Sequence, residues 1–312
     1  MRADPVTPRP PLDPSAAASR RHLDPRFYQI AVLSGLLIYG LGWLHFDITP
    51  DRAALLLSTA LLTQYVCAKL WGLPKFDPKS ALISGLSLCL LLRTNYAMLA
   101  IAAAVITIAS KFVVRWNGKH IFNPTNFGLV FLMVVGAPVW VSPGQWGNVA
   151  YFGFLMACLG GLVVNRAARS DVTYAFLISF AALQFGRAFL VMQRWQVPLH
   201  RLESGALLLF AFFMISDPKT TPNSRAGRIL FACLVTVLAG FIQFGLYRTN
   251  SILWSLAILS TAVPLIDRLL PGVQYDWSRV RSKPQPQGVP DEAASGVRQP
   301  ALDRPALGPS GV

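Results

Sequence analysis

Polar side chains that could bind a ligand stand in two short runs of an otherwise apolar sequence. The first run reads Gly118-Lys119-His120-Ile121-Phe122-Asn123-Pro124-Thr125-Asn126. Asn123 followed by Pro124 is typical of a helix N-cap, and the free amides of a first helical turn could also hold an anion or a carbonyl-rich ring. Asn126 lies one turn inside the helix, where capping does not require it. A capped helix start and a ligand site therefore both remain open.

The second run reads Ser216-Asp217-Pro218-Lys219-Thr220-Thr221-Pro222-Asn223-Ser224-Arg225. Its two prolines exclude a regular helix through the run. Asp217 can pair with a neighbouring cation or cap a turn, and Thr220 and Thr221 add hydroxyl groups. This density of hydrogen-bonding groups beside an apolar segment favours a structured loop. The alternative is a solvated turn that carries cytoplasmic positive charge.

A weak internal repeat places two Ser-Gly pairs at matching positions, 120 residues apart. The matching residues are Pro78, Leu82, Ser84, Gly85 and Leu88 with Pro198, Leu202, Ser204, Gly205 and Leu208. Both copies fall on short apolar segments, which in membrane transporters are the best sequence pointer to a central site. The alternative is that both glycines serve close helix packing.

Glu203 is the one acid within an apolar segment away from a clear end. An acid inside a membrane is functional by default, although pairing with Arg201 would explain it equally well. The residues that we expect to lie beside a ligand or cofactor are Ser84, Gly85, Asn123, Pro124, Asn126, Glu203, Ser204, Gly205, Asp217, Thr220 and Thr221.

No residue pattern indicates a metal site or a self-contained catalytic site. No two histidines have the i, i+4 spacing of a helical metal site, and there is no C-x-x-C motif. The four cysteines all lie in apolar runs, where packing explains them: Cys67, Cys89, Cys158 and Cys233. We therefore predict no catalytic and no metal-binding residues, and an enzyme only in the sense of a redox subunit.

Composition indicates a membrane protein. Of the 312 residues 54% are hydrophobic and only 13% are charged, with a mean hydropathy of +0.47, whereas soluble domains carry roughly 25% charged residues. Spans of about 20 residues cross a bilayer as helices. The predicted segments are 27–46, 53–72, 79–93, 95–114, 124–142, 149–166, 172–192, 200–216, 226–247 and 251–269.

The net charge of +14 then indicates how the chain is oriented in the membrane. With a cytoplasmic N-terminus, 22 of the 28 Lys and Arg residues fall on the inner side, as the positive-inside rule expects, and nucleic acid need not be invoked. We predict an all-α polytopic membrane protein of two inverted five-helix repeats, with short third and eighth helices, in the bacterial cytoplasmic membrane. Disordered cytoplasmic tails, 1–26 and 271–312, flank the transmembrane domain 27–270.

Three stretches carry a resemblance to a known family. They are Gly118–Pro124, Ser204–Pro218 with the following Thr221-Pro222 and Gly227-Arg228, and Val263–Arg268. They resemble, in turn, the F-N-P-A segment, the S-G-x-L-L-L-x-A-F-F-M-A-T-D-P signature and the last helix of the NqrB/RnfD family. This family supplies a membrane subunit to the sodium-pumping NADH:quinone reductase and to the Rnf ferredoxin:NAD oxidoreductase. The resemblance covers roughly residues 27–275.

The resemblance implies ten helices as two inverted repeats, akin to urea and ammonium channels, and other membrane subunits as partners. It also implies a flavin, FMN or riboflavin. The family's covalent attachment site is a threonine in the loop after helix five. That loop is Val141–Asn148 here and has no threonine, and Ala150–Gly153 replaces the family's G-E-x-S motif. These departures argue for noncovalent binding. The wording of the two polar runs resembles a divergent branch of UnbU-type proteins, associated with enediyne-biosynthesis gene clusters.

Three functions remain open at this point. The first is an integral subunit of an electron-transport assembly that couples electron flow to ion movement. The second is a small-solute or ion transporter, which the paired short segments would suit. The third is an accessory membrane protein of a biosynthetic pathway.

Overall fold

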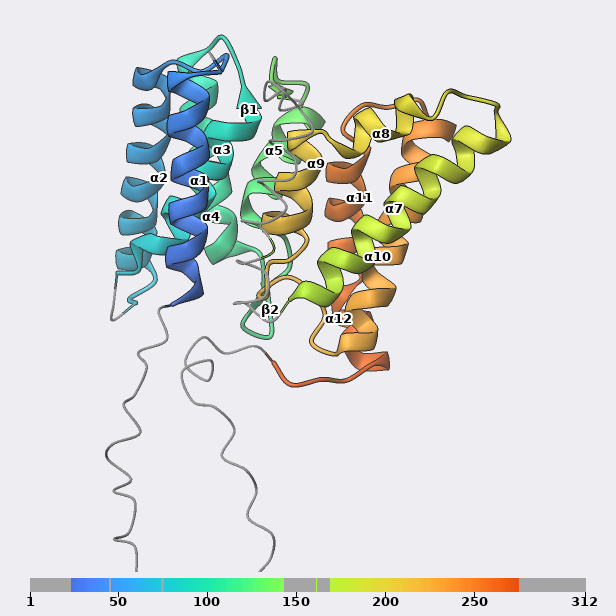
Figure 1. Cartoon of the computed structure of the whole chain (residues 1–312). Helices are drawn as coiled ribbons and strands as arrows, with labels where there is room; N and C mark the ends of the chain where they lie inside the picture. Colours follow the sequence, from blue (N-terminus) through green and yellow to red (C-terminus); the bar gives the residue numbers. More distant parts are fainter. Residues whose placement is uncertain (1–23, 45, 74–75, 143–160, 162–168, 275–312) are drawn as a thin grey trace, which may run out of the picture. The chain divides into compact units, whose positions relative to one another are not determined.

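A computed structural model describes residues 24–44, 46–73, 76–142, 161 and 169–274, and these residues are mostly helical (Figure 1). The first half contains α1 (Pro25–Gly42), α2 (Pro50–Leu70), α3 (Pro78–Leu91), α4 (Ala97–Val113) and α5 (Pro124–Val134). All of these except α4 have proline in the first turn, where its missing N–H would have had no helical partner.

The second half contains more broken helices than the first. Its elements are α7 (Ser170–Leu190), α8 (Gln196–Leu202), α9 (Gly205–Leu209) with the π-helical turn η2 (Phe210–Met214), α10 (Arg225–Gly240) with the π-helical turn η3 (Phe241–Gly245), α11 (Ser251–Ser260) and α12 (Val263–Leu269). α8 and the helix after it meet at 48°, and α11 and α12 meet at 55°. Pro264 in the first turn of α12 accounts for the second break.

Helices that are close in the sequence pack against one another in each half. α2 packs against α3 and α4, α1 against α3, and α4 against α5, whereas α10 packs against α7 and α11 (Figure 1). Contacts between α5 and α11 join the halves. Buried leucine, alanine and phenylalanine side chains from these helices form one core.

Two small antiparallel strand pairs fix the connections. β1 (Leu92–Arg93) pairs with β4 (Trp140–Val141), and β2 (Arg115–Trp116) pairs with β3 (Lys119–His120). Asn117 and Gly118 between β2 and β3 both have positive φ, at 48° and 76°. An Asn-Gly pair is the preferred sequence for such a two-residue hairpin turn. This hairpin holds Lys119 and His120 at the start of α5.

The described helices make the chain a membrane protein with several candidate spans. α2, α7 and the continuous Arg225–Gly245 helix, each of 21 residues, are long and apolar enough to cross a bilayer. The number rises to five if each bent pair counts as one span, and α3, α4 and α5 are shorter apolar helices. The exposed faces carry large apolar side chains such as Phe189 and Leu190, both 80% exposed, which suits contact with lipid.

Several predicted boundaries need correction. α1 starts at Pro25, so Asp24 and Arg26 belong to a helix start and not to the predicted tail. The predicted helix 124–142 ends at Val134, because Gly136 takes a left-handed conformation and β4 follows. The segments predicted as 200–216 and 251–269 are bent pairs. The predicted segment 149–166, apart from Gly161, lies outside the described residues, as do most of both tails. The ten-helix inverted repeat and the domain boundaries stay predictions.

Candidate functional site

Asn123 connects the two polar runs of the sequence. It caps α5, because its Oδ1 atom accepts a hydrogen bond of 3.1 Å from the backbone N–H of Asn126. Its Nδ2 atom donates to Asp217 Oδ2 at 3.3 Å. The Asn123 side chain thus both caps α5 and contacts the second polar run.

Asp217 organises the loop that follows η2. Its Oδ1 atom accepts from the backbone N–H of Lys219 at 3.0 Å, and its backbone oxygen accepts from the hydroxyls of Thr220 and Thr221 at 3.4 and 3.0 Å. Burial raises the pKa of the Asp217 carboxyl, against the opposing effects of the hydrogen bond from Lys219 N, of the charges of Lys219 and Lys111, and of the hydrogen bond from Asn123. The run is a structured loop. We call Asn123, Asp217, Thr220 and Thr221 the Asn123–Asp217 cluster.

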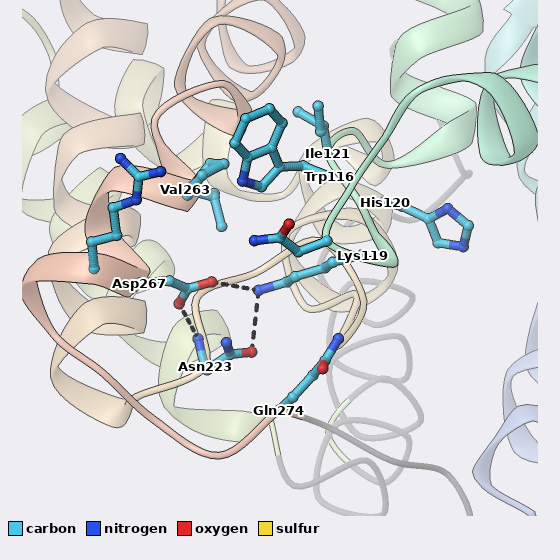
Figure 2. Close-up of a pocket in the computed structure, with 11 residues that line it drawn as sticks. Trp116, Lys119, His120, Ile121, Asn223, Val263, Asp267 and Gln274 are labelled. Carbon is cyan, nitrogen blue, oxygen red and sulfur yellow. Dashed lines mark hydrogen bonds and ion pairs between the residues drawn. The ribbon is translucent and has the colours of Figure 1, made fainter.

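Lys119 ties this loop to the start of α5 and to α12. Its Nζ atom donates to Thr221 O at 2.5 Å, to Asn223 Oδ1 at 3.2 Å and to Asp267 Oδ2 at 3.0 Å. Asp267 Oδ1 in turn accepts from the backbone N–H of Asn223 at 2.7 Å (Figure 2). Sequence reasoning quoted Lys119 and Asp267 only as parts of motifs and did not foresee this contact. The one sequence signal for this contact was that Lys119 and Asp267 carry opposite charges and belong to two different motifs.

A cavity of about 250 Å³ opens beside this ion pair (Figure 2). Its wall offers an indole ring, three amides and an exposed guanidinium, which can stack on and hydrogen-bond to a planar heterocycle. These groups come from Trp116, Asn117, Asn223, Arg268 and Gln274.

His120 borders the same region, but its ring points away from the other labelled side chains (Figure 2). Burial lowers its pKa to about 3, helped by the positive charges of Lys219, Arg115 and Lys111. Its Nδ1 atom is buried without a hydrogen-bond partner in the described structure. His120 is therefore a neutral imidazole at physiological pH.

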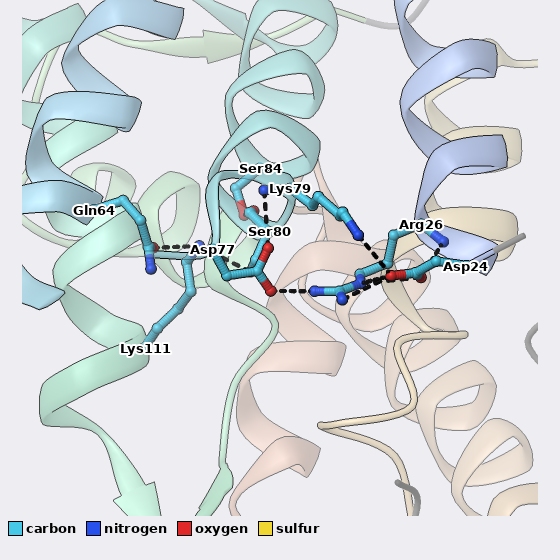
Figure 3. Close-up of polar contacts among 8 residues, drawn as sticks. All are labelled: Asp24, Arg26, Gln64, Asp77, Lys79, Ser80, Ser84 and Lys111. Carbon is cyan, nitrogen blue, oxygen red and sulfur yellow. Dashed lines mark hydrogen bonds and ion pairs between the residues drawn. The ribbon is translucent and has the colours of Figure 1, made fainter. Parts of the chain in front are cut away.

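A buried lysine and a partly buried ion-pair network lie at the starts of α1 and α3 and at the end of α4 (Figure 3). Lys111 is 4% exposed, and its Nζ atom donates to Ser80 Oγ at 3.1 Å and to Gln64 Oε1 at 3.4 Å. Nearby, Asp24 accepts from Arg26 and from Lys79 Nζ at 3.0 Å. Burial opposes ionisation of Asp24, but the hydrogen bonds from these two cations prevail and hold its pKa at about 2.

The predicted residues of α3 and α5 lie deeper in the protein. Asn126 is fully buried, and its Nδ2 atom donates to Leu253 O at 3.2 Å, whereas its Oδ1 atom has no partner in the described structure. Ser84 donates to Ser80 O at 3.1 Å within α3. A Cβ on Gly85 would lie 3.1 Å from a Leu57 side-chain atom, which supports the packing alternative for this glycine.

The second Ser-Gly pair lies apart from the Asn123–Asp217 cluster. Ser204 is the N-cap residue of α9, Gly205 opens that helix, and Glu203 ends α8. The alternative reading of Glu203, a pairing with Arg201, is not found among the ion pairs of the described residues, where Arg201 Nη1 donates to Gln184 Oε1 at 3.0 Å. The structure thus brings together Asn123, Pro124, Asn126, Asp217, Thr220 and Thr221, but not Glu203, Ser204 and Gly205.

The cysteines follow the packing prediction only in part. Cys67 and Cys89 are buried, whereas Cys233 is exposed on α10. Cys158 lies outside the described residues. Within those residues, no group of three His, Cys, Asp or Glu side chains could hold a metal ion.

Residues 138–275 match the NQR2, RnfD, RnfE family. This stretch begins shortly after α5 and ends shortly after α12, and it contains Asp217, Asn223 and Asp267. This stretch contains two of the three motifs that resemble the family. The narrower assignment to the UnbU-type branch stays a prediction.

The chain is also similar to curated RnfD-type proteins, each named as a subunit of an ion-translocating oxidoreductase complex. The protein of Cronobacter sakazakii is 32% identical over 154 residues, which cover 48% of this chain and 42% of the relative. The protein of Citrobacter koseri is 33% identical over 127 residues, covering 39% and 34%. The protein of Erwinia tasmaniensis is 34% identical over 126 residues, with the same coverage. The chain thus spans less than half the length of these relatives.

Proposed function

We propose that this chain, whose residues 138–275 match the NQR2, RnfD, RnfE family, is an integral membrane subunit of an Rnf- or Nqr-like electron-transport assembly. In this role it couples electron transfer to ion movement, and its partners are the other membrane subunits of that assembly. The names of its relatives, which are subunits of an ion-translocating oxidoreductase complex, support this assignment.

The contact of Lys119 with Asp267 is the observation that carries the proposal. Asp267 lies in the family-matched stretch, whereas Lys119 and Asn123 precede it. The three motifs that resemble the family therefore meet at one place, although they are far apart in the sequence. Such convergence is expected of a functional site and is not needed for three unrelated helix ends.

We call the cavity of about 250 Å³ beside Lys119 and Asp267 the Trp116 cavity and propose that it holds a flavin noncovalently. The indole of Trp116 can stack on an isoalloxazine ring, the amides of Asn117, Asn223 and Gln274 suit its carbonyl and ring-nitrogen edge, and Arg268 can pair with a phosphate. When bound, a flavin supplies one- or two-electron transfer. Lys119 is held by Asp267 and therefore keeps the cavity wall in place.

We further propose that the two halves are inverted repeats. Gln64 and Gln184 are 120 residues apart, the same offset as the Ser-Gly pairs, and both are buried. Each accepts a hydrogen bond from a cation, Lys111 in the first half and Arg201 in the second. The packing of α2 on α4 and of α7 on α10 follows the same correspondence.

The test is purification of the tagged full chain from its native membrane. We expect co-purifying flavoprotein or iron–sulfur subunits and a flavin absorbance that is lost in Trp116→Ala. Trp43→Ala is the matched control, because Trp43 is 71% exposed at the end of α1 and is not part of the cavity. Well-folded protein without flavin and without redox partners would overturn the proposal. Flux of a small solute through liposomes of the isolated chain would favour the transporter instead.

A further inference from the structure

A second cavity, of about 240 Å³, lies at the opposite end of α9 from the Asn123–Asp217 cluster. Its wall combines side chains of α7, α8, η3 and the starts of α9 and α11. The polar groups that the inference uses are Gln184, Arg201, Ser204, Gln243, Asn250 and Ser251. We call this the Arg201 cavity.

Hydrogen bonds fix the direction of the two glutamine amides. Arg201 Nη1 donates to Gln184 Oε1 at 3.0 Å, and Gln184 Nε2 donates to Gln243 Oε1 at 2.9 Å. The side-chain oxygen of Gln243 is therefore the acceptor at the end of this series of hydrogen bonds. The NH₂ group of Gln243 and the other N–H groups of Arg201 are left as donors at the cavity wall.

Arg201 lines this cavity, and Arg187, which does not line it, lies close to Arg201. The guanidinium groups of Arg187 and Arg201 lie over the same ring, that of Phe244, at 4.1 and 5.5 Å from its centroid. Within the described part of the chain, no carboxylate lies within ion-pair distance of either arginine, and no acid lines the cavity. Two neighbouring cations beside apolar helices are unfavourable unless an anion accompanies them.

The backbone adds to this positive potential. Asn250 adopts a left-handed conformation, with φ of 57°, and stands at the N-cap position of the ten-residue helix α11 without a capping hydrogen bond from its side chain. The first N–H groups of α11 have no partners within the helix, and the helix dipole is positive at this end. Since Asn250, Ser251 and Ile252 line the cavity, the start of α11 faces it.

We propose that the Arg201 cavity binds an oxyanion, a carboxylate or phosphate group, with Arg201 as a forked donor and the amide of Gln243 as a second one. A guanidinium matches the two oxygens of such a group. This site is separate from the Trp116 cavity and does not depend on the proposed redox function.

The oxyanion can be a free solute or the headgroup of an anionic lipid. A neighbouring groove of about 650 Å³ shares Asn250 with the cavity and is lined largely by apolar side chains such as Met133, Leu246 and Trp254. An apolar groove of this kind can hold the acyl chain of a lipid. Both ligands present an oxyanion to Arg201. Only the lipid would also place an acyl chain in this groove.

The test uses the purified full chain in neutral detergent. Inorganic phosphate is titrated by calorimetry at constant ionic strength, and in a second arm the retention of phosphatidylglycerol against phosphatidylcholine is measured by native mass spectrometry. In whichever of the two measurements detects binding to the wild type, we expect Arg201→Gln to weaken that binding at least about tenfold and Arg201→Lys to weaken it less. Arg194→Gln is the matched control, because Arg194 is exposed in the preceding turn and does not line the cavity.

Gln243→Leu removes an uncharged donor and leaves both arginines in place, so it tests the site even if Arg201→Gln fails to fold. A several-fold loss of binding is expected. Binding to phosphate alone identifies a free anion, and selective retention of phosphatidylglycerol identifies a lipid headgroup. Equal binding by wild type, Gln243→Leu and the folded Arg201 variants, or no binding in either arm, overturns the proposal.

Discussion

The Asn123 amide joins α5 to the loop after η2, since Nδ2 donates to Asp217 Oδ2 at 3.3 Å while Oδ1 caps the helix. One side chain thus satisfies a helix end and orients a carboxylate. Because both partners depend on it, small changes at Asn123 have separable effects on the cap and on the loop.

Asn123→Ala removes the cap and the bond to Asp217 together. We expect a loss of about 1–2 kcal/mol in the free energy of unfolding, since a lost cap and a lost hydrogen bond each contribute about 1 kcal/mol. Asn123→Asp keeps a capping oxygen but places a second carboxylate beside Asp217. Denaturation in detergent measures both variants. An Asp variant as stable as the wild type would show that the bond to Asp217 contributes nothing.

The ion pair of Lys119 with Asp267 can be measured by a double-mutant cycle of Lys119→Met and Asp267→Asn. Both side chains are mostly buried, at 13% and 18% exposure, and we expect a coupling free energy of about 1 kcal/mol or more, above the range of exposed pairs. Lys69→Met on the exposed face of α2 serves as the control for loss of a lysine. Additive effects of the two substitutions would contradict the assigned contact.

His120→Gln tests the neutral imidazole through its pH dependence. Its folded-state pKa of about 3 lies below the ordinary value of 6.5, so the unfolded state binds the proton more tightly. The wild type therefore loses stability as pH falls from 6.5 towards 3, at roughly 1.4 kcal/mol per pH unit relative to the variant. Unfolding at several pH values checks this. His200→Gln, at an exposed position, is the control for loss of a histidine.

Gly128→Ala tests the closest approach of α4 and α5. A Cβ at Gly128 would lie 2.0 Å from Thr107 Oγ1 and 3.3 Å from Ala103 O, so we expect a loss of about 1–3 kcal/mol from overpacking. Gly35→Ala is the matched control, since nothing lies within 4 Å of that Cβ and alanine favours a helix by about 1 kcal/mol. Equal thermal stability of the two variants would show that the helices are not this close.

Single cysteines test the predicted topology in a chain whose native cysteines are replaced. Arg225→Cys is expected to react only after permeabilisation of the cytoplasmic membrane, whereas Arg194→Cys is expected to react with an impermeant thiol reagent from outside. Both positions are exposed, so burial does not explain a difference. Reaction of both from one side would contradict the predicted topology and hence the inverted repeat.

Sequence patterns located helices well and contacts poorly. Apolar runs bounded by prolines and polar residues predict a helix over α2 or α7 to within three residues, because burial and capping are local in sequence. The contact between Lys119 and Asp267 joins residues 148 positions apart and depends on packing, which no local pattern reports. The break between Leu202 and Gly205 was missed, although the polar residues Glu203 and Ser204 mark the place where the apolar run begins.

The two π-helical turns alter which way the following residues face. A π turn contains one residue more than an α turn, and each residue of an α-helix advances the side chain by about 100°. The extra residue in Phe210–Met214 thus rotates the chain just before Asp217 by over a quarter of a revolution. The direction of this carboxylate is set by residue count as much as by residue type. Deleting one phenylalanine there would leave composition nearly unchanged and yet turn Asp217 away from Asn123.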